Sequence, residues 1–172
     1  PLVAAALLSS IGSTYHRLGL FDRAEEPLLS ARATCERLLG ANDATTLDVV
    51  HELGTLYLHQ GRLGEAEPLL VGVLKARRRF LPSDDDRVLS AMNDLALLYG
   101  DAERLEESEA LFAEAVKAQV ARHGAEDPYS LTLLHNYAWT LIRLGKYDLA
   151  EPAATRALAG RRKQLGNEHP AT

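Results

Sequence analysis

The sequence is poor in cysteine and in aromatic residues. Cys35 is its only cysteine, and aromatic side chains make up 6% of the chain. One cysteine excludes both an intrachain disulfide and a metal site built from several thiolates, so we expect Cys35 to be a small buried thiol. This cysteine usage fits a reducing compartment, and we expect a cytoplasmic protein.

The sequence also lacks a long apolar run. None approaches the roughly 20 residues that a membrane-spanning helix requires. The apolar residues 1–8 have no basic segment before them, as a secretory signal would, and they follow the register of the repeats described below. We therefore interpret them as part of the fold and expect no membrane partner.

An excess of positive charge is absent as well. The chain has 19 basic and 24 acidic residues, a net charge of -5. Attraction to nucleic-acid phosphates requires an excess of Lys and Arg, so we expect no nucleic-acid partner. The basic clusters at 77–79 and 161–163 fall at predicted helix ends, where cations complement the helix dipole.

No motif for catalysis is present. The sequence contains no G-x-S-x-G, no H-E-x-x-H and no glycine-rich phosphate loop. His51 and His135 share a repeat position, but they are two predicted hairpins apart and too distant for one metal ion. His51 and His59 lie on different turns of one predicted helix, off a common line. We expect no enzyme, no cofactor and no metal site.

The main positive feature of the sequence is a 42-residue repeat. Residues 3–44, 45–86, 87–128 and 129–170 align without a gap. A glycine recurs near the middle of three copies, and a glutamate recurs in all four. The glutamates are Glu25, Glu67, Glu109 and Glu151.

Within each copy the apolar spacing predicts two amphipathic helices, over 3–17 and 22–39 in the first copy. The recurrent glycine, Gly19 in that copy, marks the turn between them. Small residues at Gly12 and Ala24 allow the two helices to approach closely. Each hairpin leaves one apolar face uncovered, so successive hairpins are expected to stack into an all-α solenoid of four antiparallel helix hairpins.

The second copy resembles the tetratricopeptide repeat. Val50, Leu53-Gly54, Tyr57, Ala66 and Leu70 have the spacing of its consensus. The 42-residue period is similar to the longer subtype of kinesin light chains. The resemblance implies a right-handed superhelix whose first helices line a concave groove that binds protein or peptide partners, as a non-catalytic scaffold.

The resemblance also implies which side chains face that groove. Asn side chains often hold the peptide in this family, because an amide both donates and accepts hydrogen bonds. Trp139 is either a groove anchor or the cover of the last hairpin. The candidate groove residues are Ser9, Ser13, His16, Arg17, His51, Thr55, His59, Asn93, Leu97, Asp101, His135, Asn136, Trp139 and Arg143.

We expect residues 1–172 to form a single array, cut from a longer one at both ends. Exposed ends of such an array give an alternative function, an oligomerisation or sensor segment acting through end-to-end or symmetric packing. Charge is uneven along the array. The third repeat has four basic and nine acidic residues, -5, and the fourth has six and three, +3. A bound peptide would then be basic opposite the third repeat and acidic opposite the fourth.

Overall fold

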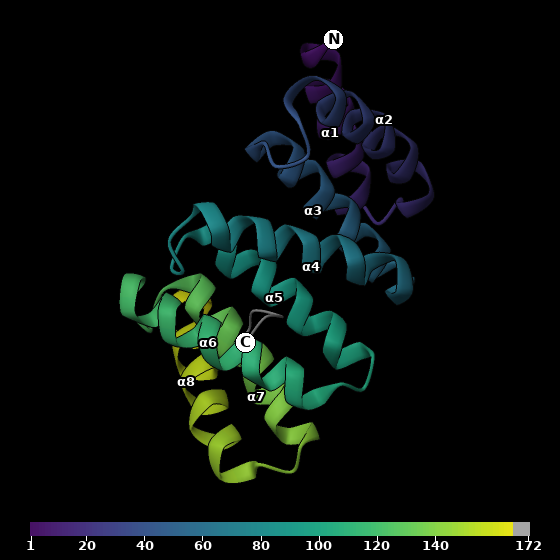
Figure 1. Cartoon of the computed structure of the whole chain (residues 1–172). Coiled ribbons are helices and arrows are strands. Elements are labelled where there is room, and N and C mark those ends of the chain that lie inside the picture. The colour runs from purple at the N-terminus through teal and green to yellow at the C-terminus, as the bar shows by residue number, and fades with distance from the viewer. Residues whose placement is uncertain (167–172) are drawn as a thin grey trace. The chain divides into compact units, whose positions relative to one another are not determined.

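The computed structural model describes residues 1–166, which form α-helices joined by short turns, with no strand in that range (Figure 1). The all-α prediction is confirmed. The helices are α1 (Leu2–Arg17), α2 (Phe21–Leu39), α3 (Ala44–His59), α4 (Leu63–Phe80), α5 (Asp86–Asp101), α6 (Leu105–His123), α7 (Pro128–Arg143) and α8 (Tyr147–Leu165). The end of the fourth predicted repeat, 167–170, lies outside the described residues.

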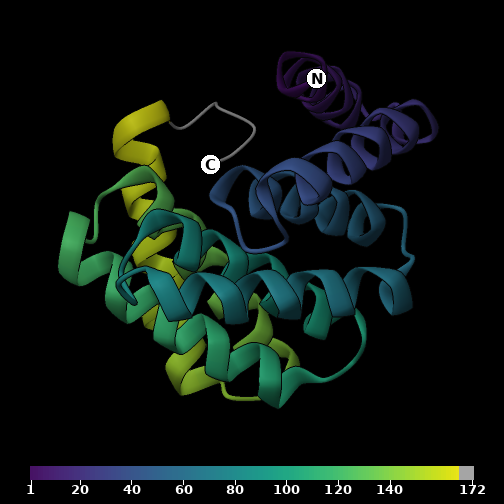
Figure 2. The same ribbon diagram turned by 45° about the horizontal axis from the view of Figure 1, so that its top comes forward.

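The chain divides into two compact units. Unit 1 is Pro1–Phe80 with α1 to α4, and unit 2 is Leu81–Thr172 with α5 to α8. In unit 1, α1 packs on α2, α2 on α3 and α3 on α4; unit 2 repeats this order with α5 to α8. Figure 2 shows the helix hairpins of each unit from a second side. Within each unit the predicted stacking of hairpins is confirmed.

Turn chemistry sets the helix boundaries. Gly19, Gly61 and Gly145 follow the first helices with φ near +70°, a conformation that costs glycine little. Glu103 occupies the same position of the third repeat and keeps a positive φ of 60° without being glycine. The period of the turn is therefore preserved even where its preferred residue is not.

An aspartate begins each first helix after α1. Asp43, Asp85 and Asp127, which are 42 residues apart, accept hydrogen bonds from backbone N–H groups in the first turns of α3, α5 and α7. Such caps satisfy amide groups that have no partner inside the helix. The acidic cluster at 84–86 thus caps a helix, as expected for a solvated turn.

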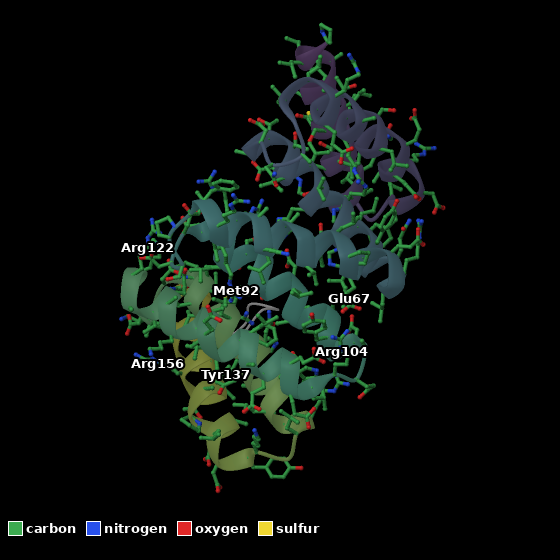
Figure 3. The ribbon with its side chains drawn as sticks, in the orientation of Figure 1. Glu67, Met92, Arg104, Arg122, Tyr137 and Arg156 are labelled. Carbon is green, nitrogen blue, oxygen red and sulfur yellow. The ribbon has the colours of Figure 1, made fainter. Side chains whose placement is uncertain are left out.

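Each unit buries an apolar core between its helices. In unit 1, Leu28, Leu53 and Leu70 are fully buried. In unit 2, α7 and α8 bring Leu134 against Ala157, and the half-buried Tyr137 packs against this cluster (Figure 3). Removing this apolar surface from water is the main stabilising contribution to folding.

The recurrent glutamate of the second helix links successive hairpins. Glu25 on α2 accepts hydrogen bonds from the Tyr57 hydroxyl, at 3.0 Å, and from Arg62 Nη1, at 2.8 Å. In unit 2, Glu109 on α6 accepts two hydrogen bonds from Lys146 Nζ, at 2.8 and 2.6 Å. The partner cation lies 37 residues after the glutamate in both cases. The glutamate therefore stabilises the stacking of one hairpin on the next.

Changing Glu25 to Gln is expected to lower the free energy of unfolding by about 1 kcal/mol at pH 7. The hydrogen bond from Arg62 lowers the pKa of Glu25 below its ordinary 4.5, with a smaller contribution from Tyr57. A lowered pKa stabilises the fold above the ordinary value, and this stabilisation is lost as the pH falls through the folded-state pKa. The difference between wild type and Glu25→Gln should therefore shrink below about pH 4.5.

Urea unfolding followed by circular dichroism between pH 3 and pH 8 measures this difference. The control is Glu26→Gln, the same change at the exposed neighbouring position. Equal effects of the two substitutions, or a Glu25 effect that does not change with pH, would contradict the assigned role.

Candidate functional site

A cavity of about 400 Å³ opens on the face of unit 2 that α5 and α7 share. Its walls come from the second half of α5 and from α7, and its floor comes from α6. The cavity is lined by Ala96, Leu97, Gly100, Asp101, Ser108, Phe112, His135, Asn136, Trp139, Thr140 and Arg143. Six of these were predicted from the sequence as groove residues: Leu97, Asp101, His135, Asn136, Trp139 and Arg143.

The largest apolar surface of the cavity belongs to Trp139. Its side chain is 60% exposed, whereas Phe112 beneath is 1% exposed. An exposed indole lining a cavity differs from the isolated surface hydrophobics found on any protein, because a partner could bury it. The floor is fixed by Ser108, whose hydroxyl donates to the carbonyl oxygen of Ala96 at 2.8 Å.

Two asparagine side chains contact each other beside the cavity. Asn136 Nδ2 donates to Asn93 Oδ1 at 3.0 Å, and Asn93 Nδ2 donates to Asp94 Oδ1 at 2.8 Å. The relay fixes the orientation of the Asn136 amide. Its Oδ1 accepts no hydrogen bond from the described residues, so it can accept one from a bound N–H group.

Charges at the rim of the cavity are partly neutralised. Arg143 donates from Nη1 to the Gly100 carbonyl at 2.9 Å, and its Nη2 lies 2.7 Å from Glu103 Oε1. Partial removal of the ring from water lowers the pKa of His135, and the charge of Arg161 lowers it further, which favours the neutral imidazole at pH 7. Asp101 is exposed and has no ion pair among residues 1–166. Its carboxylate is thus the one cavity-lining charge in that range without a countercharge.

The corresponding face of unit 1 contains a chain of polar side chains. His16 Nδ1 lies 2.9 Å from Glu52 Oε1, and His16 Nε2 lies 2.7 Å from His59 Nδ1. The hydrogen bond from His16 lowers the pKa of Glu52. Phe21 packs edge-on against the His16 ring, with ring centroids 5.8 Å apart. Predicted groove residues from α1 and α3 thus lie together.

Of the other unit 1 candidates, Ser13 and Thr55 contact Glu52 of this chain, whereas His51 and Arg17 lie apart from it. His51 Nδ1 contacts Arg77 Nη1 at 3.2 Å, and the buried Arg77 also donates to Asp48 at 2.7 Å. Thr55 donates to the backbone carbonyl of Glu52 at 2.9 Å. Arg17 is exposed at the end of α1. Ser13 is half-buried on α1, and its hydrogen bond helps to lower the pKa of Glu52.

Sequence reasoning missed the pair of His16 and His59 because it compared residues within one column or one helix. Contacts between neighbouring first helices instead join residues 43 apart, one period plus one. His16 with His59, Asn93 with Asn136 and Gly100 with Arg143 all have this separation. That offset could have found the pair. It would not have found Ser108, Phe112 and Thr140, which look like ordinary core positions.

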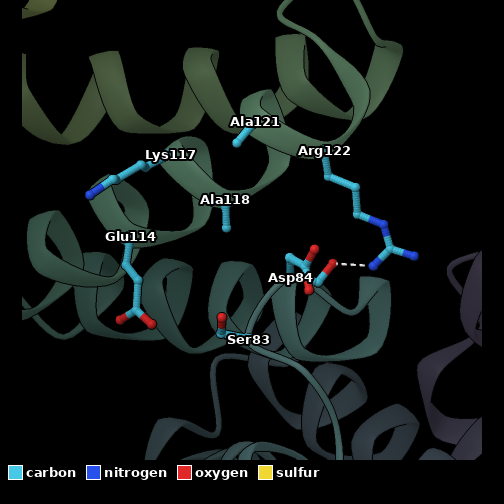
Figure 4. A pocket seen from close by; sticks show the side chains of 7 residues that line it. All are labelled: Ser83, Asp84, Glu114, Lys117, Ala118, Ala121 and Arg122. Atoms are coloured by element: carbon cyan, nitrogen blue, oxygen red, sulfur yellow. Dashed lines mark hydrogen bonds between the residues drawn. The ribbon is translucent and has the colours of Figure 1, made fainter.

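Two other cavities lie within residues 1–166. One, of about 440 Å³, lies in unit 2 between α6 and the segment before α5, where Arg122 donates to the backbone carbonyl of Asp84 (Figure 4). Its lining mixes acidic and basic side chains, including Glu114 and Lys117. The other, of about 340 Å³, lies in unit 1 above the buried thiol of Cys35.

Within residues 1–166, no three or more His, Cys, Asp or Glu side chains are grouped so that they could hold a metal ion. In the same described range, no helix combines the length and apolar character needed to cross a membrane.

Solved structures share this architecture. A kinesin light chain protein of Podosopora anserina with nearly identical tetratricopeptide-like repeats is 24% identical, with a TM-score of 0.85; the match covers 99% of this chain and 81% of that one. BtubC (BKLC) of P. vanneervenii is 20% identical, with a TM-score of 0.83 and coverages of 96% and 66%. A double mutant of MamA from RS-1 is also 20% identical, with a TM-score of 0.67 and coverages of 95% and 78%. No curated protein matches the sequence.

The sequence itself decides the family. The family described as tetratricopeptide repeat matches residues 3–79 and 87–163, which together make up most of the chain. The resemblance stated from the second repeat is confirmed, and the kinesin light chain-like subtype agrees with the solved structures. The chain therefore belongs to the tetratricopeptide repeat family.

Proposed function

We propose that this protein is a non-catalytic scaffold that binds a protein or peptide segment on the face formed by α5 and α7. The observation that carries the proposal is the cavity beside Trp139, where a 60% exposed indole faces open space. Repeats of this family generally mediate protein interactions. A rigid helical face also loses little conformational entropy when it binds, which favours affinity.

The polar groups of the cavity suit a peptide backbone. The Asn136 amide oxygen is held in place by the Asn93 contact and can accept a peptide N–H group. A backbone contact fixes the register of the peptide, while side-chain pockets provide specificity. The proposed scaffold is one continuous array of four repeats. Its proposed location is the cytoplasm.

Trp139→Ala is expected to lower the affinity for peptides that bind in the cavity at least tenfold, because tryptophans buried in an interface often dominate the binding energy. The experiment selects peptides from a random displayed library on the wild-type protein and measures their affinities by calorimetry. Tyr147→Ala is the matched control, since Tyr147 is 66% exposed but lies outside the cavity. If the selected peptides bind wild type and Trp139→Ala with equal affinity, they bind at a surface other than the α5–α7 face. A selection that enriches no peptide would refute the proposal.

A second candidate function is self-association through α1. Leu7 and Ile11 are 60% and 45% exposed, whereas their counterparts in the second repeat, Val49 and Leu53, are 3% and 0% exposed. The α1 face thus has the apolar character of a face that is buried in the next repeat. Light scattering that gives one monomer mass at all concentrations would argue against this function.

A further inference from the structure

The two units differ at one position that decides how open this face is. His16 in α1 and Gly100 in α5 occupy the same place, 84 residues or two repeats apart. In unit 1 the imidazole of His16 lies between Glu52 and His59 and contacts Phe21. In unit 2 the position has no side chain, and a Cβ at Gly100 would meet atoms no nearer than 3.7 Å. Gly100 therefore leaves room in the unit 2 cavity for a Cβ, which would make ordinary contact with Arg143 and Ser108.

The neighbouring positions change together with Gly100. Trp139 and Asp101 in unit 2 replace Thr55 and Arg17 of unit 1. The unit 2 cavity thus combines a large aromatic surface with a negative charge, where unit 1 has a small polar side chain and a positive charge. Aromatic faces attract cations, and the attraction strengthens as the site loses water.

The balance of charge around the cavity also favours a cation. Arg143 is the only charged residue of α7, and its guanidinium pairs with Glu103. Asp101 has no such countercharge within the described range. Apart from Arg143, the basic residues of the fourth repeat come after α7, and none of them lines the cavity. The sequence predicts that a bound peptide is acidic opposite the fourth repeat. Because most of the basic residues behind this prediction lie outside the cavity, it does not extend to the cavity.

We propose that the α5–α7 cavity binds a basic side chain of the partner, an arginine stacked on Trp139 and paired with Asp101. The proposal rests on the proposed function and adds the chemistry of its ligand. The planar guanidinium can stack on the indole while its N–H groups donate to the carboxylate. The Asn136 Oδ1 atom provides a second acceptor at the same wall. Unit 1 does not bind arginine in this way, because His16 and Arg17 take the corresponding places.

The test uses N-acetyl-arginine amide as the probe and N-acetyl-citrulline amide as its neutral counterpart of the same shape. Trp139 is the only tryptophan, so its fluorescence reports on this cavity directly. We expect a saturable fluorescence change with the arginine probe and at least threefold weaker binding of the citrulline probe. Raising the salt concentration should reduce the difference, because the ion pair is partly screened.

Variants identify the residues responsible. Asp101→Asn should lower the affinity for the arginine probe at least threefold and leave that for the citrulline probe unchanged. The control is Asp148→Asn, at an acidic residue outside the cavity, which should change neither affinity. Gly100→His copies the unit 1 side chain and should abolish binding. Gly100→Ala, for which the structure has room, keeps the test valid if the His variant does not fold. The affinity of Gly100→Ala for the arginine probe should fall between those of the wild type and of Gly100→His.

Equal binding of the arginine and citrulline probes, or no effect of Asp101→Asn, would overturn the arginine site. Selected library peptides that need Trp139 but contain no basic residue would also overturn it while leaving the proposed function intact. A library that yields no groove-dependent peptide would instead refute the proposed function. The two failures are therefore distinguishable.

Discussion

Replacing Phe112 with alanine is expected to lower the free energy of unfolding of unit 2 by about 3–5 kcal/mol. Phe112 is 1% exposed and forms the floor of the α5–α7 cavity. Truncation removes the transfer free energy of a whole ring and leaves a void that the surrounding helices can fill only in part. Because a domain is stable by only about 5–15 kcal/mol, this loss is a large fraction of the total.

Urea unfolding followed by Trp139 fluorescence reports on unit 2, since the only tryptophan lies in α7. The matched control is Leu149→Ala on α8, where the side chain is 55% exposed and the expected cost is within about 0.5 kcal/mol. Similar costs for the two variants would show that Phe112 is not packed as described.

Hydrogen exchange gives an independent measurement of the Phe112 effect. Amide groups of α6 and α7 should exchange faster in Phe112→Ala, while those of α1 and α2 keep their rates, because repeat proteins can open locally. Uniform acceleration along the whole chain would instead indicate a single cooperative unit. Faster exchange confined to α6 and α7 would show how strongly the floor of the cavity stabilises its walls.

Most of the fold could be predicted from the sequence because the determinants of each repeat are local. The turn glycine, the apolar spacing and the small residues at Gly12 and Ala24 all act within one hairpin, and the helices predicted over 3–17 and 22–39 agree with α1 and α2 within one residue. The Glu25 contacts could not be predicted in the same way. They connect a second helix to the following hairpin, and periodicity alone does not name the partner.

The candidate site could be predicted only in part for a related reason. A family resemblance names the face of each first helix, and Trp139 and Asn136, both predicted on that face, line the cavity. Whether that face is open depends on the size of the side chain at one position, which is His16 in unit 1 and Gly100 in unit 2. The difference between His16 and Gly100 becomes meaningful only when the contacts of His16 with Glu52 and His59 are known.

Replacing Gly12 with alanine is expected to cost about 1–3 kcal/mol, although alanine favours a helix by about 1 kcal/mol over glycine. A Cβ at Gly12 would lie 2.6 Å from Leu28 Cγ and 3.2 Å from the Ala24 carbonyl oxygen. Leu28 is fully buried, and its Cγ cannot move away without a shift of α2. The substitution would therefore push α1 and α2 apart.

Gly72 on α4 is the matched control, because nothing lies within 4 Å of a Cβ built there. Gly72→Ala should stabilise unit 1 by about 0.5–1 kcal/mol, since only the helix propensity changes. Opposite signs for the same substitution at two positions of one unit would separate steric crowding from propensity. Ellipticity at 222 nm during urea unfolding measures both effects.

A double-mutant cycle with Leu28→Ala identifies the crowding atom. The fourth repeat carries Ala138 and Ala154 at the positions of Gly12 and Leu28, so two small residues are compatible with this hairpin. Gly12→Ala should therefore be neutral or stabilising in the Leu28→Ala background, giving a coupling of at least about 1 kcal/mol. If Gly12→Ala costs the same in both backgrounds, the crowding comes from the α2 backbone, and the small residue sets the spacing of the helices directly.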